Sequence, residues 1–218
     1  MPLKQTLSAL CLAAALAGCA SKVPEPSQYS GFLGDYSQLQ PASSPSGAPV
    51  LRWAAPGFDA SHYSSVLVER PALTPRPTAT ERVDQATLDA LPGYLQQAIA
   101  KRLGARYRLV GRAEPGTLIL RSAITGVDVS NEGLHAYEVI PIALVVAATS
   151  SAIGTRDQAT AVFIEAEAID ADSGQAVFKV VRKGAGKSLE NASAKPTLGD
   201  LEPALDAWAE DAASWRQR

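Results

Sequence analysis

Catalytic chemistry has few candidate residues in this sequence. The chain contains two histidines, His62 and His135, and no Gly-x-Ser-x-Gly segment that would present a nucleophilic serine. A serine hydrolase needs a base and an orienting acid beside its nucleophile, so we expect surface or turn positions for both histidines. Carboxylates are more numerous, because 22 acidic residues allow many pairs. Glu165 and Glu167 alternate on one predicted strand, which is typical of a solvated face, and a carboxylate-dependent hydrolase stays open as an alternative.

Two short segments are similar to ligand-binding loops but lack part of each pattern. The segment 184–188 (GAGKS) ends as a phosphate-binding loop does, yet Val181 stands where that loop needs its first glycine. The segment 170–174 (DADSG) has the aspartates of a calcium loop, but Gly174 stands where an oxygen ligand is needed. We interpret the first as a chance match and the second as a hairpin turn, and we expect no metal, cofactor or nucleotide.

A modest basic cluster lies at the end of one predicted strand. Its members are Lys179, Arg182, Lys183 and Lys187. We interpret it as a solvated edge that protects the sheet from pairing with another chain, with an anionic ligand as the alternative. The whole chain has 20 Lys and Arg against 22 acidic residues, for a net charge of -2. That balance gives no support for nucleic acid as a partner, which would need a basic face.

The strongest chemical signal is the N-terminal segment that ends at Cys19. Lys4 precedes an apolar run over residues 7–17, which is too short for a permanent membrane span. The run ends in Leu16-Ala17-Gly18-Cys19 and resembles the lipobox of bacterial lipoproteins, in which a signal peptidase cuts before the cysteine. The pattern predicts loss of residues 1–18 as a signal peptide and a diacylglyceryl group on the Cys19 thiol. The alternative is an ordinary cleaved signal with a chance cysteine.

Anchoring through Cys19 predicts the compartment and the first partner, the membrane. Two or more acyl chains give stable attachment, since each buried methylene contributes about 0.8 kcal/mol. Ala20 stands where an aspartate usually marks inner-membrane retention in this class, so we expect delivery to the outer membrane, facing the periplasm. Cys11 leaves with the signal peptide, so the mature chain keeps no thiol for a disulfide, a metal or catalysis.

Residues 19–57 are predicted to form a Pro/Ser-rich tether, followed by a single domain over residues 58–218. Fully extended, residues 20–30 reach at most about 36 to 40 Å. An apolar island at residues 31–39 interrupts the tether and places four side chains on one helical face: Phe32, Leu33, Tyr36 and Leu39. Two interpretations are open. The island docks the tether on the domain, or Phe32 and Tyr36 belong to a surface that contacts a partner.

The domain is predicted to be α+β, with two principal helices on one face of a mainly antiparallel sheet of about four to five strands. We expect a first helix over residues 84–104, kinked or starting late because of Pro92, and a second over residues 201–215 capped by Asp200. The predicted strands cover residues 64–70, 107–111 and 117–129, and a hairpin pairs 160–169 with 175–182.

An uncharged segment at residues 139–153 (VIPIALVVAATSSAI) has two interpretations. It is too short to span a membrane without help. We favour a short apolar helix or insert that is buried against the domain. The alternative is an exposed contact surface around Ile142, Val145 and Val146, suited to an acyl chain, an envelope protein or another copy of the chain.

Taken together, these segments resemble one family of bacterial lipoproteins, grouped as domain of unknown function 3313. The resemblance covers nearly all of the mature chain and departs at Pro92-Gly93 in the first helix. It implies a periplasmic lipoprotein of Gram-negative envelopes and carries no catalytic residue. The segments that carry it are the lipobox and residues 31–39, 123–128 (AITGVD), 137–144 (YEVIPIAL), 154–157 (GTRD), 182–184 and 186–187.

We therefore expect an outer-membrane-anchored, non-catalytic binding or accessory module. Its expected partners are the membrane, through the lipid on Cys19, and an envelope protein, with no nucleic acid or nucleotide. A carboxylate-dependent envelope hydrolase and a scaffold subunit of a secretion or transport assembly are the alternatives.

Overall fold

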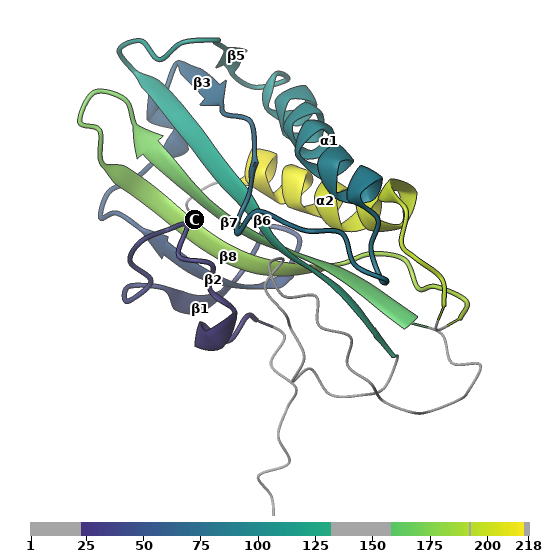
Figure 1. Cartoon of the computed structure of the whole chain (residues 1–218). Helices are drawn as coiled ribbons and strands as arrows, with labels where there is room; N and C mark the ends of the chain where they lie inside the picture. The colour runs from purple at the N-terminus through teal and green to yellow at the C-terminus, as the bar shows by residue number, and fades with distance from the viewer. Residues whose placement is uncertain (1–22, 132–157, 192, 216–218) are drawn as a thin grey trace, which may run out of the picture.

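A computed structural model describes residues 23–131, 158–191 and 193–215. In these ranges an eight-stranded sheet carries both α-helices on one face (Figure 1). The strand order is β1-β2-β8-β7-β6-β3-β5, and β4 pairs with β6. The strands are β1 (Gln40–Ser43), β2 (Pro49–Ala54), β3 (Ser65–Val68), β4 (Ala72–Leu73), β5 (Arg108–Leu109), β6 (Thr117–Asn131), β7 (Gln158–Asp170) and β8 (Ala176–Ala185). The helices are α1 (Gln85–Leu103), α2 (Leu198–Ser214) and the short 3-10 helices η1 (Pro26–Gln28) and η2 (Ala60–His62).

The α+β class and the two helices on one face are as predicted, but the sheet is larger and mixed. β3 pairs in parallel with β5 and β6, and β4 pairs in parallel with β6. The connection from β3 to β6 runs through α1, and such a crossover allows parallel pairing where a tight turn would not. β4 has two residues, too short for an alternating pattern to be seen in the sequence, whereas β5 lies inside the strand predicted over residues 107–111.

The segment predicted as a tether, residues 19–57, is not irregular throughout, because β1 and β2 lie in it and extend the sheet. Leu51 of β2 lies opposite Val181 of β8 in an antiparallel pair. The prolines that suggested a loop occupy positions that a sheet tolerates. Pro41 lies on the edge strand β1, and Pro49 is the first residue of β2. Since β2 pairs with residues 178–181 of β8, Lys179 is not on a sheet edge, contrary to the prediction.

The core lies between the sheet and the two helices. α1 buries a stripe of apolar side chains: Leu88, Leu91, Leu95, Ile99 and Leu103. The helix begins at Gln85 and contains Pro92, so the expected late start is not observed. Trp208 and Leu205 are the large buried side chains at the centre of α2. Among the described residues, no helix has the length and apolar character that crossing a membrane requires.

α2 begins three residues before its predicted start. Thr197 is the N-cap and Asp200 the third helical residue, whose carboxylate accepts a hydrogen bond from the Thr197 backbone N–H at 2.9 Å. A Thr197–Asp200 pair of this kind satisfies free amides at the helix start. Asp200, the predicted cap, therefore lies inside the helix and not before it.

Candidate functional site

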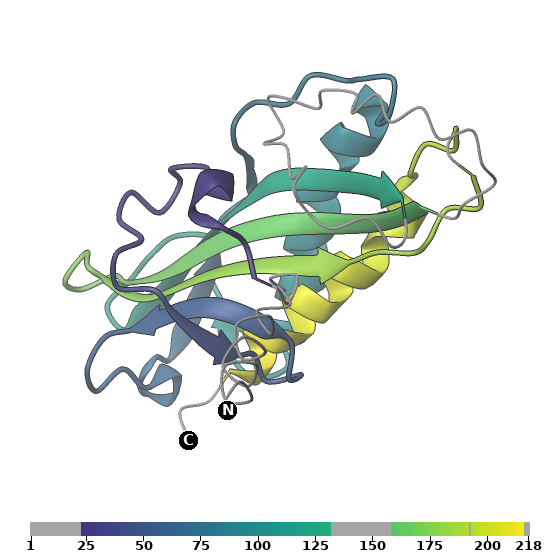
Figure 2. The same ribbon diagram turned by 90° about the horizontal axis from the view of Figure 1, so that it is seen from below.

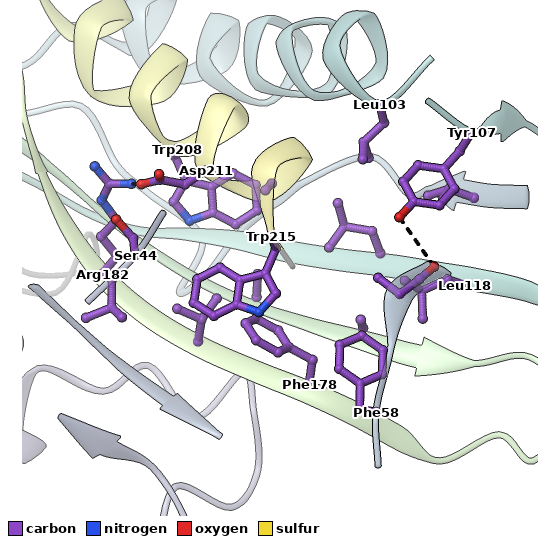
Figure 3. Close-up of a pocket in the computed structure, with 18 residues that line it drawn as sticks. Ser44, Phe58, Leu103, Tyr107, Leu118, Phe178, Arg182, Trp208, Asp211 and Trp215 are labelled. Atoms are coloured by element: carbon purple, nitrogen blue, oxygen red, sulfur yellow. Dashed lines mark hydrogen bonds and ion pairs between the residues drawn. The ribbon is translucent and has the colours of Figure 1, made fainter. Parts of the chain in front are cut away.

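An apolar cavity of about 90 Å³ lies between the C-terminal half of α2 and the sheet (Figure 3). Aliphatic and small side chains of five strands and both helices line it, and the aromatic rings of Phe58, Phe178, Trp208 and Trp215 complete it. Buried members from the sheet are Val50, Val66, Leu118, Ala166, Ala168 and Val180. The alanines at 166 and 168 leave space that larger residues would fill. The cavity is therefore built by residue size as well as by backbone geometry.

A buried ion pair forms one end of this cavity. Arg182 of β8 donates from Nη1 to the Asp211 carboxylate of α2, and each side chain is 7% exposed. Asp211 also accepts hydrogen bonds from the backbone N–H and hydroxyl of Ser46, at 2.7 and 2.9 Å. Arg182 Nε is buried and has no acceptor in the part of the chain that the structure describes. The Nε–H of Arg182 is thus a donor that no described acceptor satisfies.

A wider and more polar recess adjoins the cavity. Ala60, Tyr107 and Trp215 line both spaces, and the recess adds Asp59, Ser61, Tyr63, Ser64 and Arg106. Tyr107 donates its hydroxyl hydrogen to the Ala60 carbonyl at 3.3 Å, which is the dashed contact in Figure 3. The Trp215 ring lies 4.7 Å from the Arg52 guanidinium and 4.8 Å from the Phe178 ring. Aromatic side chains therefore separate the apolar cavity from the polar recess.

The two carboxylates singled out on β7 are buried, not solvated as predicted. Glu165 accepts hydrogen bonds from the Ser30 N–H at 2.8 Å and from the Tyr36 hydroxyl at 2.5 Å. Glu167 accepts from Arg121 Nη1 at 2.9 Å. Burial and the neighbouring Glu165 charge raise the pKa of Tyr36 to about 12. Residues 23–39 cover this face, opposite the helices (Figure 2).

Phe32 and Tyr36 pack on the sheet, in the arrangement of the docking interpretation. Tyr36 stacks on Tyr29 with ring centroids 4.4 Å apart, and the Phe32 ring lies 5.6 Å from the Arg121 guanidinium. Leu33 is the buried centre of the small cluster that these rings surround. The other candidate contact residues, Ile142, Val145 and Val146, lie outside the described residues, as does His135.

The basic residues of β8 do not form one site, because neighbouring strand residues point to opposite faces. Arg182 faces the helices and pairs with Asp211. On the other face, Lys179 donates to the carbonyls of Leu33 and Asp35 at 3.0 and 3.1 Å. Lys183, also on that face, lies 3.1 Å from the Asp128 carboxylate. These basic side chains therefore do not converge on one place where an anion could bind.

The two loop-like segments have structural roles. A Cβ atom on Gly186 would lie 2.3 Å from Thr160 Oγ1 and 2.6 Å from the Asp200 carbonyl oxygen, so glycine permits the close approach of this segment to α2. In the segment 170–174, Asp170 accepts from the Ser173 N–H at 2.7 Å and closes the hairpin. Within the described residues, no group of three His, Cys, Asp or Glu side chains is placed to hold a metal ion. His62 is exposed in η2.

The cavity and the Arg182–Asp211 pair do not follow from the sequence patterns. Their residues come from segments far apart in the chain, and no spacing rule connects them. A weak signal existed, since Asp211 interrupts the apolar face of the last helix near Trp208 and Trp215. Charged residues are almost never fully buried unless they are paired, so an aspartate on a buried face requires a partner.

Comparison with known proteins gives the family. The family described as "Protein of unknown function (DUF3313)" matches residues 28–212. The chain belongs to the DUF3313 family. This DUF3313 protein is 44% identical over 206 residues to the "Uncharacterized lipoprotein YdcL" of Escherichia coli K12, covering 94% of this chain and 93% of that protein. The O157:H7 protein of the same name matches equally. The resemblance inferred from the sequence segments is confirmed.

Solved structures similar to this DUF3313 protein are more distant. A PelC dodecamer from Paraburkholderia phytofirmans is 14% identical with a TM-score of 0.40, covering 77% of this chain and 98% of that one. A putative neuraminyllactose-binding hemagglutinin homolog from Helicobacter pylori is 8% identical with a TM-score of 0.35, covering 69% and 81%. These values are too low to transfer an assembly or a ligand to the DUF3313 chain.

Proposed function

We propose that this DUF3313 protein is a lipid-anchored binding module of the outer membrane that faces the periplasm. The segment Leu16-Ala17-Gly18-Cys19 and the YdcL lipoproteins support the anchor. The observation that carries the binding role is the apolar cavity behind Trp215, with its polar recess outside. A binding role needs no catalytic group, which agrees with the structural use of the motifs tested above.

The ligand proposed for this cavity is amphipathic. An apolar cavity of about 150 Å³ takes up benzene, so a space of about 90 Å³ suits a short alkyl end rather than a whole acyl chain. The polar part of the ligand would lie in the recess beside Ser61 and Arg106.

The hydrolase alternative draws no support from the β7 carboxylates. Glu165 and Glu167 lie on the same face, but each already binds the groups described above. A general acid and base need access to the substrate, and the segment 23–39 covers Glu165. We therefore do not propose a hydrolase, and no described contact favours the scaffold role over a binding module.

A matched pair of substitutions on α2 tests the cavity. Ala212→Leu introduces a larger side chain into the cavity lining, whereas Ala207→Leu makes the same change five residues earlier in α2, outside the lining. With the Cys19→Ser chain, we expect medium-length alkyl alcohols and carboxylates to raise the melting temperature, as ligands that bind only the folded state do. Ala212→Leu should abolish that rise and Ala207→Leu should keep it. Equal behaviour of the two variants would contradict the proposed site.

The anchor is tested separately. Cys19→Ser removes the thiol that would be acylated, so the protein should leave the outer-membrane fraction and appear in the soluble periplasmic fraction. Immunoblotting of separated membranes measures the change. If the variant still fractionates with outer membranes as the unchanged chain does, the lipid anchor is refuted.

A further inference from the structure

The segment that joins the lipid to the domain is itself docked on the sheet. Val23, the first described residue, already packs with the Leu33, Leu51 and Val181 cluster. Farther along, the buried Glu165 carboxylate holds the segment through the two hydrogen bonds described above. The part between the anchor and the docked chain is therefore only residues 20–22.

This docking shortens the reach of the anchor. Four residues lead from Cys19 to Val23, and at 3.3 to 3.6 Å per residue they span at most about 14 Å. The sequence analysis allowed about 36 to 40 Å, because it treated residues 20–30 as free chain. Acyl chains on Cys19 lie in the leaflet, so Val23 must stay within about 14 Å of the point where the chain enters the lipid.

We propose that the sheet face covered by residues 23–39 rests against the lipid surface of the outer membrane. The inference rests on the lipid anchor of the proposed function. The two α-helices cover the opposite face of the sheet and therefore point away from the membrane (Figures 1 and 2). The domain is held in one orientation and does not swing on a long tether.

Charge attraction between residues 23–39 and lipid headgroups does not hold the docked face against the membrane. Residues 23–39 contain Glu25 and Asp35, both exposed, and no lysine or arginine. Anionic lipid headgroups attract basic clusters, which this segment lacks. The short linker and the docked segment must hold the face in place. The orientation should therefore be independent of ionic strength, since salt screens charge interactions but not a covalent tether.

Single-cysteine labelling of the full lipidated protein tests the orientation. Cys11 leaves with the signal peptide and Cys19 is acylated, so an introduced cysteine is the one free thiol. Ser37→Cys places a fluorophore on the docked segment, far from the anchor in sequence. The matched site Lys101→Cys is on α1, and both positions are exposed. Each protein is reconstituted into phosphatidylethanolamine–phosphatidylglycerol vesicles with nitroxide-labelled headgroups.

We expect most of the fluorescence to be lost at residue 37 and none at residue 101, in low and in high salt. Tyr36→Phe and Glu165→Gln, which weaken docking, should reduce the loss at residue 37. Equal quenching at both sites, or stronger quenching at residue 101, would overturn the orientation. Flotation of the same vesicles separates the two proposals. A chain that does not float refutes the anchor and this inference together, whereas a floating chain with equal quenching refutes the orientation alone.

Discussion

At the scale of single residues, the charged groups that matter in this protein are the buried ones. Asp211 and Arg182 connect α2 to β8 at the end of the cavity, and Glu165 connects β7 to the N-terminal segment. Desolvating a charge costs several kcal/mol unless a partner compensates it. These positions are therefore more sensitive than the exposed ion pairs.

Asp211→Ala should destabilise the fold strongly. It leaves the Arg182 guanidinium buried without its counter-charge and removes both acceptors of Ser46. Removal of one partner of a buried pair costs about 3–5 kcal/mol. The neighbouring Glu210→Ala is the control, because Glu210 pairs with Arg102 on the surface and is 62% exposed. That change should cost at most about 1 kcal/mol. Urea unfolding of both variants measures the difference, and equal losses would contradict the assignment.

Tyr36 should make the protein lose stability at alkaline pH. Its folded pKa is raised to about 12 by burial and by Glu165, whereas an unfolded tyrosine titrates near 10. The contribution is therefore complete below about pH 10 and is lost as the pH rises from about 10 to 12, because the unfolded chain releases its proton first. Tyr36→Phe should reduce the fall in the free energy of unfolding over this pH range, measured by urea unfolding between about pH 8 and pH 11.5. An unchanged slope would contradict the prediction.

The prediction for the two β7 carboxylates was correct only in part. Alternation on β7 indicated that Glu165 and Glu167 share a face, which is correct, but not that another part of the chain covers it. The neighbouring Val162, Phe163 and Ile164 are all buried, and consecutive apolar residues of this kind are typical of a strand that is covered on both faces. The hydrogen-bond partners of Glu165 are seen only in the three-dimensional structure, since Ser30 and Tyr36 are more than 120 positions away from it in the sequence.

At the scale of elements, long periodic segments were predictable and short paired ones were not. The β7–β8 hairpin and α1 follow from alternation, turn residues and the leucine stripe, and the structure confirms them. β1 and β2 contain prolines at positions that only their place in the sheet makes acceptable. The glycines at 184 and 186, which suggested a phosphate loop, are required by the close approach of the end of β8 to α2.

Two glycine substitutions should have opposite effects. Gly186→Ala places a Cβ atom 2.3 Å from Thr160 Oγ1 and 2.6 Å from a backbone oxygen, and the backbone oxygen cannot move aside cheaply. We expect a loss of roughly 1–3 kcal/mol, as for overpacked cores. Gly93→Ala, inside α1 with no atom within 4 Å of the new Cβ, should gain roughly 0.5–1 kcal/mol in helix propensity. Thermal unfolding measures both. A tolerated Gly186→Ala would indicate that α2 is less tightly packed than described.

At the scale of the whole molecule, the chain forms three layers: the docked segment 23–39, the sheet, and the helices. The frequent prolines and serines of residues 19–57 predict a tether. Docking instead depends on Leu33, Tyr36 and their contacts with β7 and β8. Among the described residues, packing on this face of the sheet therefore already includes Val23.

Truncation measures where the folded unit begins. A chain starting at residue 23 keeps all three layers and should melt cooperatively as a single species. A chain starting at residue 40 keeps β1 and β2 but lacks the groups that donate hydrogen bonds to Glu165, so it should fold with a lower melting temperature.

A chain starting at residue 58 also loses β2, which exposes the hydrogen-bonding edge of β8 and the Val181 side chain. An unprotected edge strand pairs with other chains, so this protein should aggregate during size-exclusion chromatography. Identical melting of the three chains would mean that residues 23–57 do not contribute to the stability of the domain. They could then act as a free tether, and the docking that limits the distance from the lipid anchor to the domain would be contradicted.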